Sequence, residues 1–326
     1  MKEFLDYDKD FPELVYDIVD YFRAGNTIRE AKSKSVVDYC ANSRFNKALP
    51  GHTIIQPDIV LSLCETLTKR RVLTCIRTGT TGMDANYIFL TKDESRFLTN
   101  KSFYVFYLNC VTYGFPYIYS SFLDKVLPVI VKKDGEVMMG TCFRFLDGIV
   151  TARHCLDADF VSIPGYAKER LLQSNVIVSN DNDIDLAYIA LGEPSGLYSD
   201  EAHVLDDVLV MGYPRIPMFL DFCAGERAAI SSIPSRGSIA SLADQYISRK
   251  AGPLMLVTAR IRGGNSGGPV INAQGAIVGV AFSEPFSEGN YDKMGYGVAY
   301  PISVLFDVLE KDNTMMSVSF VDEING

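Results

Sequence analysis

The sequence is poor in the residues that build metal sites. It holds only three histidines, His52, His154 and His203, and they are scattered along a chain with no HExxH motif. Its seven cysteines are irregularly spaced and include no CxxC pair. Closely spaced histidines and cysteines are the usual signature of zinc sites. A metalloenzyme is therefore disfavoured, and we expect no metal and no cofactor.

The N-terminus lacks the features of a secretion signal. Residues Met1 to Asp6 include acidic side chains where a signal peptide needs an apolar core. An odd number of cysteines without a regular framework favours free thiols in a reducing compartment. We therefore expect a cytoplasmic protein.

Positive charge is scarce in the second half of the chain. Residues 1–125 hold 16 Lys and Arg against 15 Asp and Glu, whereas residues 126–326 hold 15 against 25. Binding to nucleic-acid phosphates needs Lys and Arg, so the second half is a poor nucleic-acid surface. The length of 326 residues and the 48% of hydrophobic residues predict two folded domains.

One stretch of the chain, residues 102–123, carries no formal charge and is long enough to span a bilayer. It contains polar residues that are costly in hydrocarbon, including Asn109, Thr112 and five tyrosines. We therefore predict a buried or interface segment and no membrane association. Residues 93–125 are predicted to form a linker or packing segment between the domains.

Residues 1–92 are predicted to form the first domain, which is mainly helical. Apolar positions at helical spacing predict helices over 11–24, 29–42 and 57–71. Strand-like runs follow at 72–76 and 87–90, separated by a turn at 79–82. Three helices followed by a hairpin resemble a winged helix-turn-helix domain. A DNA-binding recognition helix would be expected to be more basic, so DNA binding and contact with a regulatory protein both stay open.

Residues 126–326 have the pattern of an all-β domain. Short β-rich runs recur between turn signals, which predicts a barrel or sandwich. They are Val129–Val131, Gly148–Thr151, Val176–Val178, Val208–Met211 and Ala276–Val280. The whole chain is therefore predicted to be α+β.

The run Gly263-Gly264-Asn265-Ser266-Gly267-Gly268-Pro269 is the strongest chemical signal. A serine hydroxyl becomes a nucleophile when a base removes its proton. Flanking glycines allow the N–H groups of Gly264 and Ser266 to converge on a developing oxyanion. By itself, however, the run also fits a glycine-rich turn with an idle serine.

Two further runs supply the partners that a nucleophilic serine needs. In Thr151-Ala152-Arg153-His154-Cys155 a histidine follows a strand-like run, and in Asp183-Ile184-Asp185-Leu186-Ala187 an acid precedes one. The acid would orient the histidine and stabilise its protonated form. Asp181 and Asp183 are alternatives that also fit a solvated acidic turn.

These three motifs, in the order His, Asp, Ser, resemble those of trypsin-like serine proteases over about residues 126–310. Asn265 before the serine, Gly212-Tyr213-Pro214, Gly279-Val280 and Gly295–Ile302 are most similar to the bacterial Deg-type branch. The resemblance implies an all-β domain of two six-stranded barrels. It also implies a triad of His154, Asp185 and Ser266, an oxyanion hole of Gly264 and Ser266 N–H groups, and a protein substrate.

The chain departs from this family at two places. Asn265 replaces the aspartate that pairs with a new N-terminus in trypsin-like zymogens, so no such switch is expected. About 15 residues follow the barrels, too few for the C-terminal peptide-binding domain of Deg proteases. Regulation is therefore expected to come from the N-terminal region.

The resemblance also places a substrate pocket around Arg260, Phe282 and Ser283. A cationic side chain at the pocket floor would favour an acidic substrate residue, unless Arg260 points outward or Glu284 compensates its charge. Cys155 stands where secreted relatives often have a disulfide cysteine. Because Cys142 is offset from the expected partner position, we predict two buried thiols.

Two other classes of protein compete with the protease. The G-x-S-x-G run also fits an α/β-hydrolase, but that fold needs a histidine after the serine, and none follows Ser266. The second alternative is a DNA- or protein-binding regulator whose barrel is a latent or inactive scaffold. A complete triad argues against it.

Overall fold

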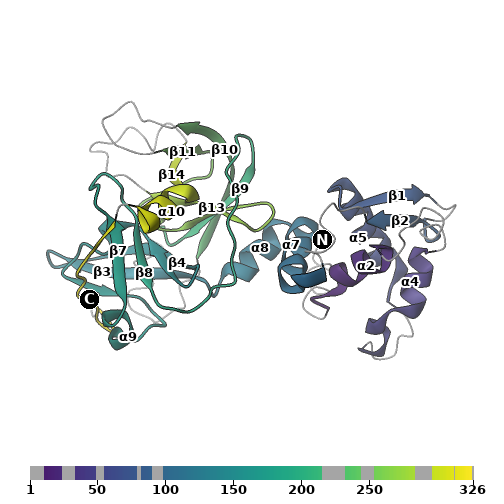
Figure 1. The fold of residues 1–326 in the computed structure, drawn as a ribbon, viewed down its shortest axis with the longest axis horizontal. Helices are drawn as coiled ribbons and strands as arrows, with labels where there is room; N and C mark the ends of the chain where they lie inside the picture. The colour runs from purple at the N-terminus through teal and green to yellow at the C-terminus, as the bar shows by residue number, and fades with distance from the viewer. Residues whose placement is uncertain are drawn as a thin grey trace. The chain divides into compact units, whose positions relative to one another are not determined.

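The computed structural model describes residues 11–23, 34–48, 55–78, 82–89, 98–214, 232–243, 253–282, 296–311 and 313–324. The chain divides into two compact units, Met1–Tyr117 and Ile118–Gly326. Figure 1 shows helices and one small hairpin in the first unit, and mainly strands in the second.

The first unit contains the predicted helices and hairpin. Its elements are α2 (Leu14–Arg23), α4 (Val36–Asn42), η1 (Arg44–Ala48), α5 (Pro57–Lys69), β1 (Leu73–Arg77), β2 (Asn86–Phe89) and α7 (Lys101–Tyr113). The apolar face of α2 is buried in one core with residues of α5, β1 and β2. The strands β1 and β2 pair antiparallel, as a hairpin requires.

Within the second predicted helix range, 29–42, residues 34 and 35 are not helical and the described helix α4 begins at Val36. Ser35 caps it: the Asp38 N–H donates to Ser35 Oγ over 3.1 Å, and the Ser35 N–H donates to the Asp38 carboxylate over 3.2 Å. This reciprocal capping box satisfies two N–H groups that have no partner inside the helix. The first residues of the predicted range, 29–33, lie outside the described residues.

The charge-free segment forms two short helices, α7 and α8 (Phe115–Phe122). Gly114, with a φ of +70°, separates them. The Asn109 side chain donates to the Pro12 carbonyl over 2.9 Å, which ties α7 to the start of α2. Across the described parts of the chain, no helix has the length and apolar character needed to cross a membrane.

The described residues of the second unit form two sheets, and the five predicted β-rich runs lie in strands except for Ala276, which precedes β13. The first sheet has the order β15-β7-β8-β5-β4-β3-β6. Its strands are β3 (Val126–Lys133), β4 (Glu136–Phe145), β5 (Gly148–Thr151), β6 (Phe160–Ser162), β7 (Asn175–Ser179), β8 (Ala187–Ala190) and β15 (Asn313–Met315). The helical turns η2 (Arg153–Cys155) and α9 (Lys168–Leu172) interrupt this series.

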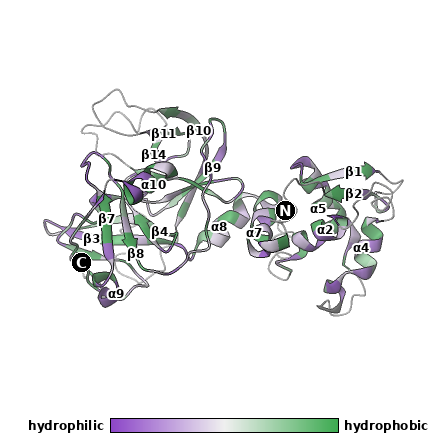
Figure 2. Cartoon of the chain, in the orientation of Figure 1, coloured by the Kyte–Doolittle hydropathy of each residue, from purple (hydrophilic) through white to green (hydrophobic). Residues whose placement is uncertain are grey.

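The second sheet is a closed barrel in the order β10-β11-β14-β13-β12-β9. Its strands are β9 (Asp207–Gly212), β10 (Ile233–Ala243), β11 (Leu254–Val257), β12 (Pro269–Asn272), β13 (Ile277–Phe282) and β14 (Gly297–Pro301), and α10 (Ile302–Glu310) follows. β12 and β13 are buried along their whole length. Figure 2 shows hydrophobic residues concentrated on the strands of this unit, as the β-rich pattern predicts.

The first sheet differs from the predicted six-stranded barrel because the C-terminal residues join it. β15 pairs with β7 at one edge of the sheet. At the other edge, the Val161 N–H of β6 donates to the Ser319 carbonyl over 3.0 Å, and the Val321 N–H donates back to Val161 over 2.9 Å. Phe320 between them is buried in the core of this sheet. The residues after the second barrel therefore contact both edges of the first sheet.

Candidate active site

Antiparallel pairing of β5 with β8 brings the predicted base and acid together. Thr151, the last residue of β5, lies opposite Ala187, the first residue of β8. His154 follows Thr151 on the short helical turn η2, and Asp185 precedes Ala187. Residues that lie far apart in the sequence thus meet at one edge of the sheet because antiparallel strands place the end of one beside the start of the other.

The Asp185 carboxylate holds His154 through both of its oxygens. One oxygen lies 2.5 Å from the imidazole Nδ1, and the other accepts the His154 backbone N–H over 2.8 Å. The imidazole is 45% exposed and the carboxylate 22%, so the ring remains accessible. A carboxylate bound at Nδ1 leaves Nε2 as the nitrogen that can exchange a proton with a substrate or nucleophile.

This pairing changes the acidity of the imidazole. Burial lowers the pKa of His154, but the hydrogen bond and charge of Asp185, together with neighbouring Cys155, raise it by more, to about 10. A nearby carboxylate favours the protonated ring. The arrangement therefore stabilises the imidazolium that forms when a histidine accepts a proton from a nucleophile.

Asp185, rather than the neighbouring acids, makes the contact with His154. The Asp181 carboxylate accepts the Asp183 N–H over 2.9 Å, which is the contact of an acidic turn. Asp183 contributes its carbonyl, which accepts the Tyr300 hydroxyl over 3.2 Å. Both alternatives therefore have the structural contacts expected of a turn.

Tyr300, in the second barrel, holds the Asp185 loop through a contact that the sequence does not predict. Its hydroxyl oxygen accepts the Asp185 N–H over 3.2 Å. Its ring stacks on Phe282 with 4.4 Å between centroids and 14° between planes. No local signal could have found this contact, because Tyr300 and Asp185 lie 115 residues apart in the sequence.

Ser266 lies on a tight loop that packs against the first sheet. Ser266 is buried, and its backbone carbonyl accepts the Thr141 N–H over 2.9 Å. The same carbonyl lies 3.8 Å from Sγ of Cys155, the residue after His154. These contacts place the predicted nucleophile loop beside η2, the helical turn after β5 that contains the histidine.

Two glycines of this loop adopt backbone conformations that other residues rarely do. The φ angles are +97° at Gly264 and +84° at Gly267. A Cβ atom at Gly267 would lie 2.6 Å from the Ala152 N atom and would also clash with the Thr141 carbonyl. The glycines of the motif are therefore needed for the turn and for the close packing against the first sheet.

Backbone hydrogen bonds give the loop a defined shape around Ser266. The N–H groups of Asn265, Gly267 and Gly268 donate to the carbonyls of Arg262, Ala281 and Asn265, over 2.9, 2.7 and 2.9 Å. The Gly264 and Ser266 N–H groups predicted to form the oxyanion hole alternate with these along the chain. Their role stays a prediction.

The predicted substrate pocket is described only in part. Arg260 is exposed, and its backbone N–H donates to Ser235 Oγ over 2.8 Å. Phe282 is buried against Tyr300. Ser283 and Glu284 lie outside the described residues. The pocket assignment therefore stays a prediction.

The two cysteines near His154 are free thiols, as predicted. Burial raises the pKa of Cys142 well above its usual range, so its thiol stays protonated. In the described ranges, no cluster of His, Cys, Asp and Glu has the arrangement of a metal site. Cys223 lies outside those ranges.

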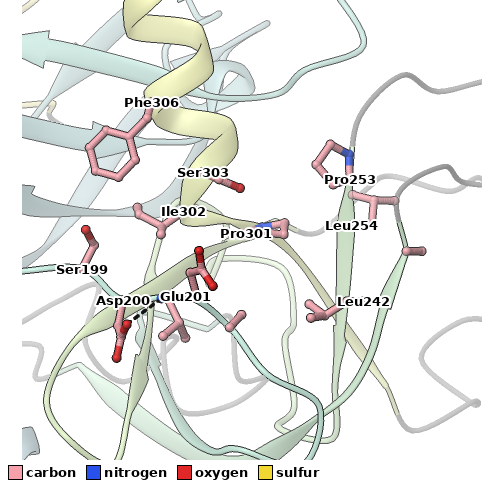
Figure 3. Close-up of a pocket in the computed structure, with 13 residues that line it drawn as sticks. Ser199, Asp200, Glu201, Leu242, Pro253, Leu254, Pro301, Ile302, Ser303 and Phe306 are labelled. Atoms are coloured by element: carbon pink, nitrogen blue, oxygen red, sulfur yellow. Dashed lines mark hydrogen bonds between the residues drawn. The ribbon is translucent and has the colours of Figure 1, made fainter.

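A cavity of about 630 Å³ opens elsewhere on the second unit. Figure 3 shows Asp200 and Glu201 near one side of it and Ile302 and Phe306, from α10, near another. Neither His154 nor Ser266 lines it. The cavity is therefore separate from the candidate active site.

Residues 140–280, less than half of the chain, match the family model of the trypsin-like peptidase domain. The second unit thus contains a trypsin-like peptidase domain, and the protein is a serine endopeptidase by class. A search of curated protein sequences found no significant match.

Several solved protease structures are similar to part of the chain. The active form of the Rv3671c protease from M. tuberculosis is 18% identical with a TM-score of 0.45, covering 62% of this chain and 86% of that one. AlgW, an HtrA-type protease solved with a tripeptide, is 19% identical with a TM-score of 0.44, covering 63% and 62%. A serine endoprotease from Yersinia pestis is 21% identical with a TM-score of 0.41, covering 60% and 64%. The chain thus spans less than two thirds of the last two.

Proposed function

We propose that this protein cleaves peptide bonds with Ser266 as nucleophile, His154 as general base and Asp185 as the group that orients His154. The observation that carries the proposal is the Asp185 carboxylate bound to both Nδ1 and the backbone N–H of His154. The contact between the Ser266 carbonyl and Sγ of Cys155 also supports it, because Cys155 is the residue after His154 and the contact brings the serine loop close to the histidine.

In the proposed reaction Ser266 Oγ attacks the substrate carbonyl while His154 Nε2 takes its proton. The resulting oxyanion accepts hydrogen bonds from the Gly264 and Ser266 N–H groups. His154 then gives its proton to the leaving amine, and an acyl-enzyme remains. Water hydrolyses this ester by the same steps, which restores the Ser266 hydroxyl.

A fluorophosphonate probe tests the assignment, because it phosphonylates only a serine whose hydroxyl is activated. We expect the full-length protein to take up one adduct, and tandem mass spectrometry to locate that adduct on Ser266. A folded protein that takes up no probe would instead favour a latent or inactive scaffold.

The substrate residue that enters the pocket is proposed to be acidic. The Arg260 guanidinium, six residues before Ser266 in the sequence, is the charge that would select it. We therefore expect a peptide library to show cleavage after Asp or Glu, and Arg260→Gln to weaken that preference. A preference for small apolar residues in the wild-type protein would contradict the proposal.

The N-terminal unit is proposed to regulate the protease through a protein partner, with a dedicated protein as substrate. It has a core of its own, as a separate binding unit needs. α5 exposes Asp58 and Glu65 as well as Lys69, so its exposed charges give no surplus of positive charge for phosphate binding. Equal activity of the full chain and residues 118–326 would contradict regulation, and a salt-dependent mobility shift with duplex DNA would favour the DNA-binding alternative.

A further inference from the structure

Thr141 is a fully buried residue of β4 that connects the first sheet to the Ser266 loop. Its hydroxyl donates to the Gly264 carbonyl over 2.6 Å. The same hydroxyl oxygen accepts the N–H of Tyr213, the residue after β9, over 3.0 Å. The hydroxyl thus uses its one proton and one of its lone pairs on two different backbone segments.

These contacts fix the peptide unit between Gly264 and Asn265 at both ends. Its carbonyl is held by Thr141, and its N–H donates to the Arg262 carbonyl over 2.9 Å. This peptide lies in the chain between the Gly264 and Ser266 N–H groups. A rotation of it would change the direction of at least one of those two groups, because they are bonded to the same short segment.

The backbone of Thr141 holds the same loop at a second point. Its N–H donates to the Ser266 carbonyl over 2.9 Å, and its carbonyl accepts the Thr151 hydroxyl over 2.8 Å. Thr151 ends β5, three residues before His154. One residue therefore contacts the loop before and after the Ser266 side chain, and also the strand that precedes His154.

We propose that Thr141 is a positioning residue that holds the oxyanion-binding conformation of the Ser266 loop through its hydroxyl. The inference rests on the proposed function of Ser266, Gly264 and His154. Thr141 acts through the Gly264 carbonyl and does not itself touch the substrate. Its role concerns the transition state, where the oxyanion develops, more than substrate binding.

Two substitutions, to valine and to serine, distinguish the effect of the Thr141 hydroxyl from the effect of the shape of the side chain. Thr141→Val keeps the shape but leaves the Gly264 carbonyl and the Tyr213 N–H without their partner. Thr141→Ser keeps the hydroxyl and loses only a methyl group. Ser162→Ala is the matched control, because Ser162 is also buried in the first sheet and its hydroxyl donates to the Asp322 carbonyl over 2.8 Å.

The full-length variants are compared by fluorophosphonate labelling, by steady-state peptide hydrolysis and by affinity for a peptide boronic acid, which forms a tetrahedral adduct. For Thr141→Val we expect kcat and the labelling rate to fall about 10- to 100-fold, with KM changed only a few-fold. Boronate affinity should fall by a similar factor. Thr141→Ser should stay within about 3-fold of wild type, and Ser162→Ala should leave all three readouts unchanged.

If Thr141→Val had the same labelling rate and the same boronate affinity as the wild type, the inference would be overturned and the proposed function would stay intact. The inference would also be overturned if the activity lost in Thr141→Val were no larger than its loss of folded protein. An equal loss in Ser162→Ala would likewise overturn it. If Thr141→Val folds poorly, Thr141→Ala removes the same hydroxyl with less volume, and its rates per folded molecule decide between the same outcomes. A folded wild-type protein that is not labelled would overturn the proposed function and this inference with it.

Discussion

Replacing Ser266 with alanine is expected to reduce kcat for peptide hydrolysis by about 10⁶-fold and to abolish fluorophosphonate labelling. Without the hydroxyl no acyl-enzyme forms, so His154 and Asp185 have no nucleophile to activate. Some acceleration over the uncatalysed reaction should remain, because the backbone N–H groups of the loop still bind a developing oxyanion. The measurement is single-turnover hydrolysis of a peptide substrate by purified full-length protein.

Ser303→Ala provides the control, because Ser303 is an exposed serine of α10 near the separate cavity. We expect it to label and hydrolyse as the wild type does. Thermal unfolding of both variants shows whether the fold is kept. If Ser266→Ala, once folded, retained most of the wild-type rate, Ser266 would not be the nucleophile.

Replacing Asp185 with asparagine is expected to lower kcat by about 10⁴-fold. An amide retains the size of the carboxylate, but it has no charge to stabilise the imidazolium. Its NH₂ group can also donate to Nδ1, which favours the tautomer with the proton on Nε2, the nitrogen that must accept the proton of Ser266. The loss should therefore appear in kcat and in the labelling rate, whereas substrate affinity changes little.

The pH dependence gives Asp185→Asn a second readout. The base must be neutral, and the pKa of His154 is raised above 6.5, to about 10. The wild-type labelling rate should therefore increase with pH through an apparent pKa above 6.5. Asp185→Asn removes the carboxylate, which is the main cause of the raised pKa of His154. The increase of the labelling rate with pH should therefore occur at lower pH in this variant.

Asp183→Asn is the matched control for this experiment, because it changes a neighbouring acid whose carbonyl, not its carboxylate, contacts Tyr300. It should leave the pH profile of the wild type nearly unchanged. NMR titration of the histidine ring protons gives the pKa of His154 directly, since only three histidines are present. An equal pH profile in Asp185→Asn and the wild type would show that Asp185 does not set the pKa of His154.

The sequence by itself determined the enzyme class, five of the strands of the second unit and the candidate triad. Each motif couples a chemical residue to a local pattern: a strand before His154, a strand after Asp185, and glycines around Ser266. Strand periodicity and glycine conformation depend on neighbouring residues, so both can be predicted from a short stretch of sequence. The helix boundary at Val36 was less legible, because the periodicity extended past the Ser35 cap.

Only the tertiary structure decided how these parts are held in place. Thr141 and Gly264 are 123 residues apart, and Tyr300 and Asp185 are 115 apart, yet each pair shares a hydrogen bond. A threonine or tyrosine hydroxyl has no sequence pattern that names its partner. The packing of Phe320 into the core of the first sheet could not be predicted either, because it depends on which strands form the two edges of that sheet. Such contacts follow from strand order and packing over the whole domain, which no local pattern encodes.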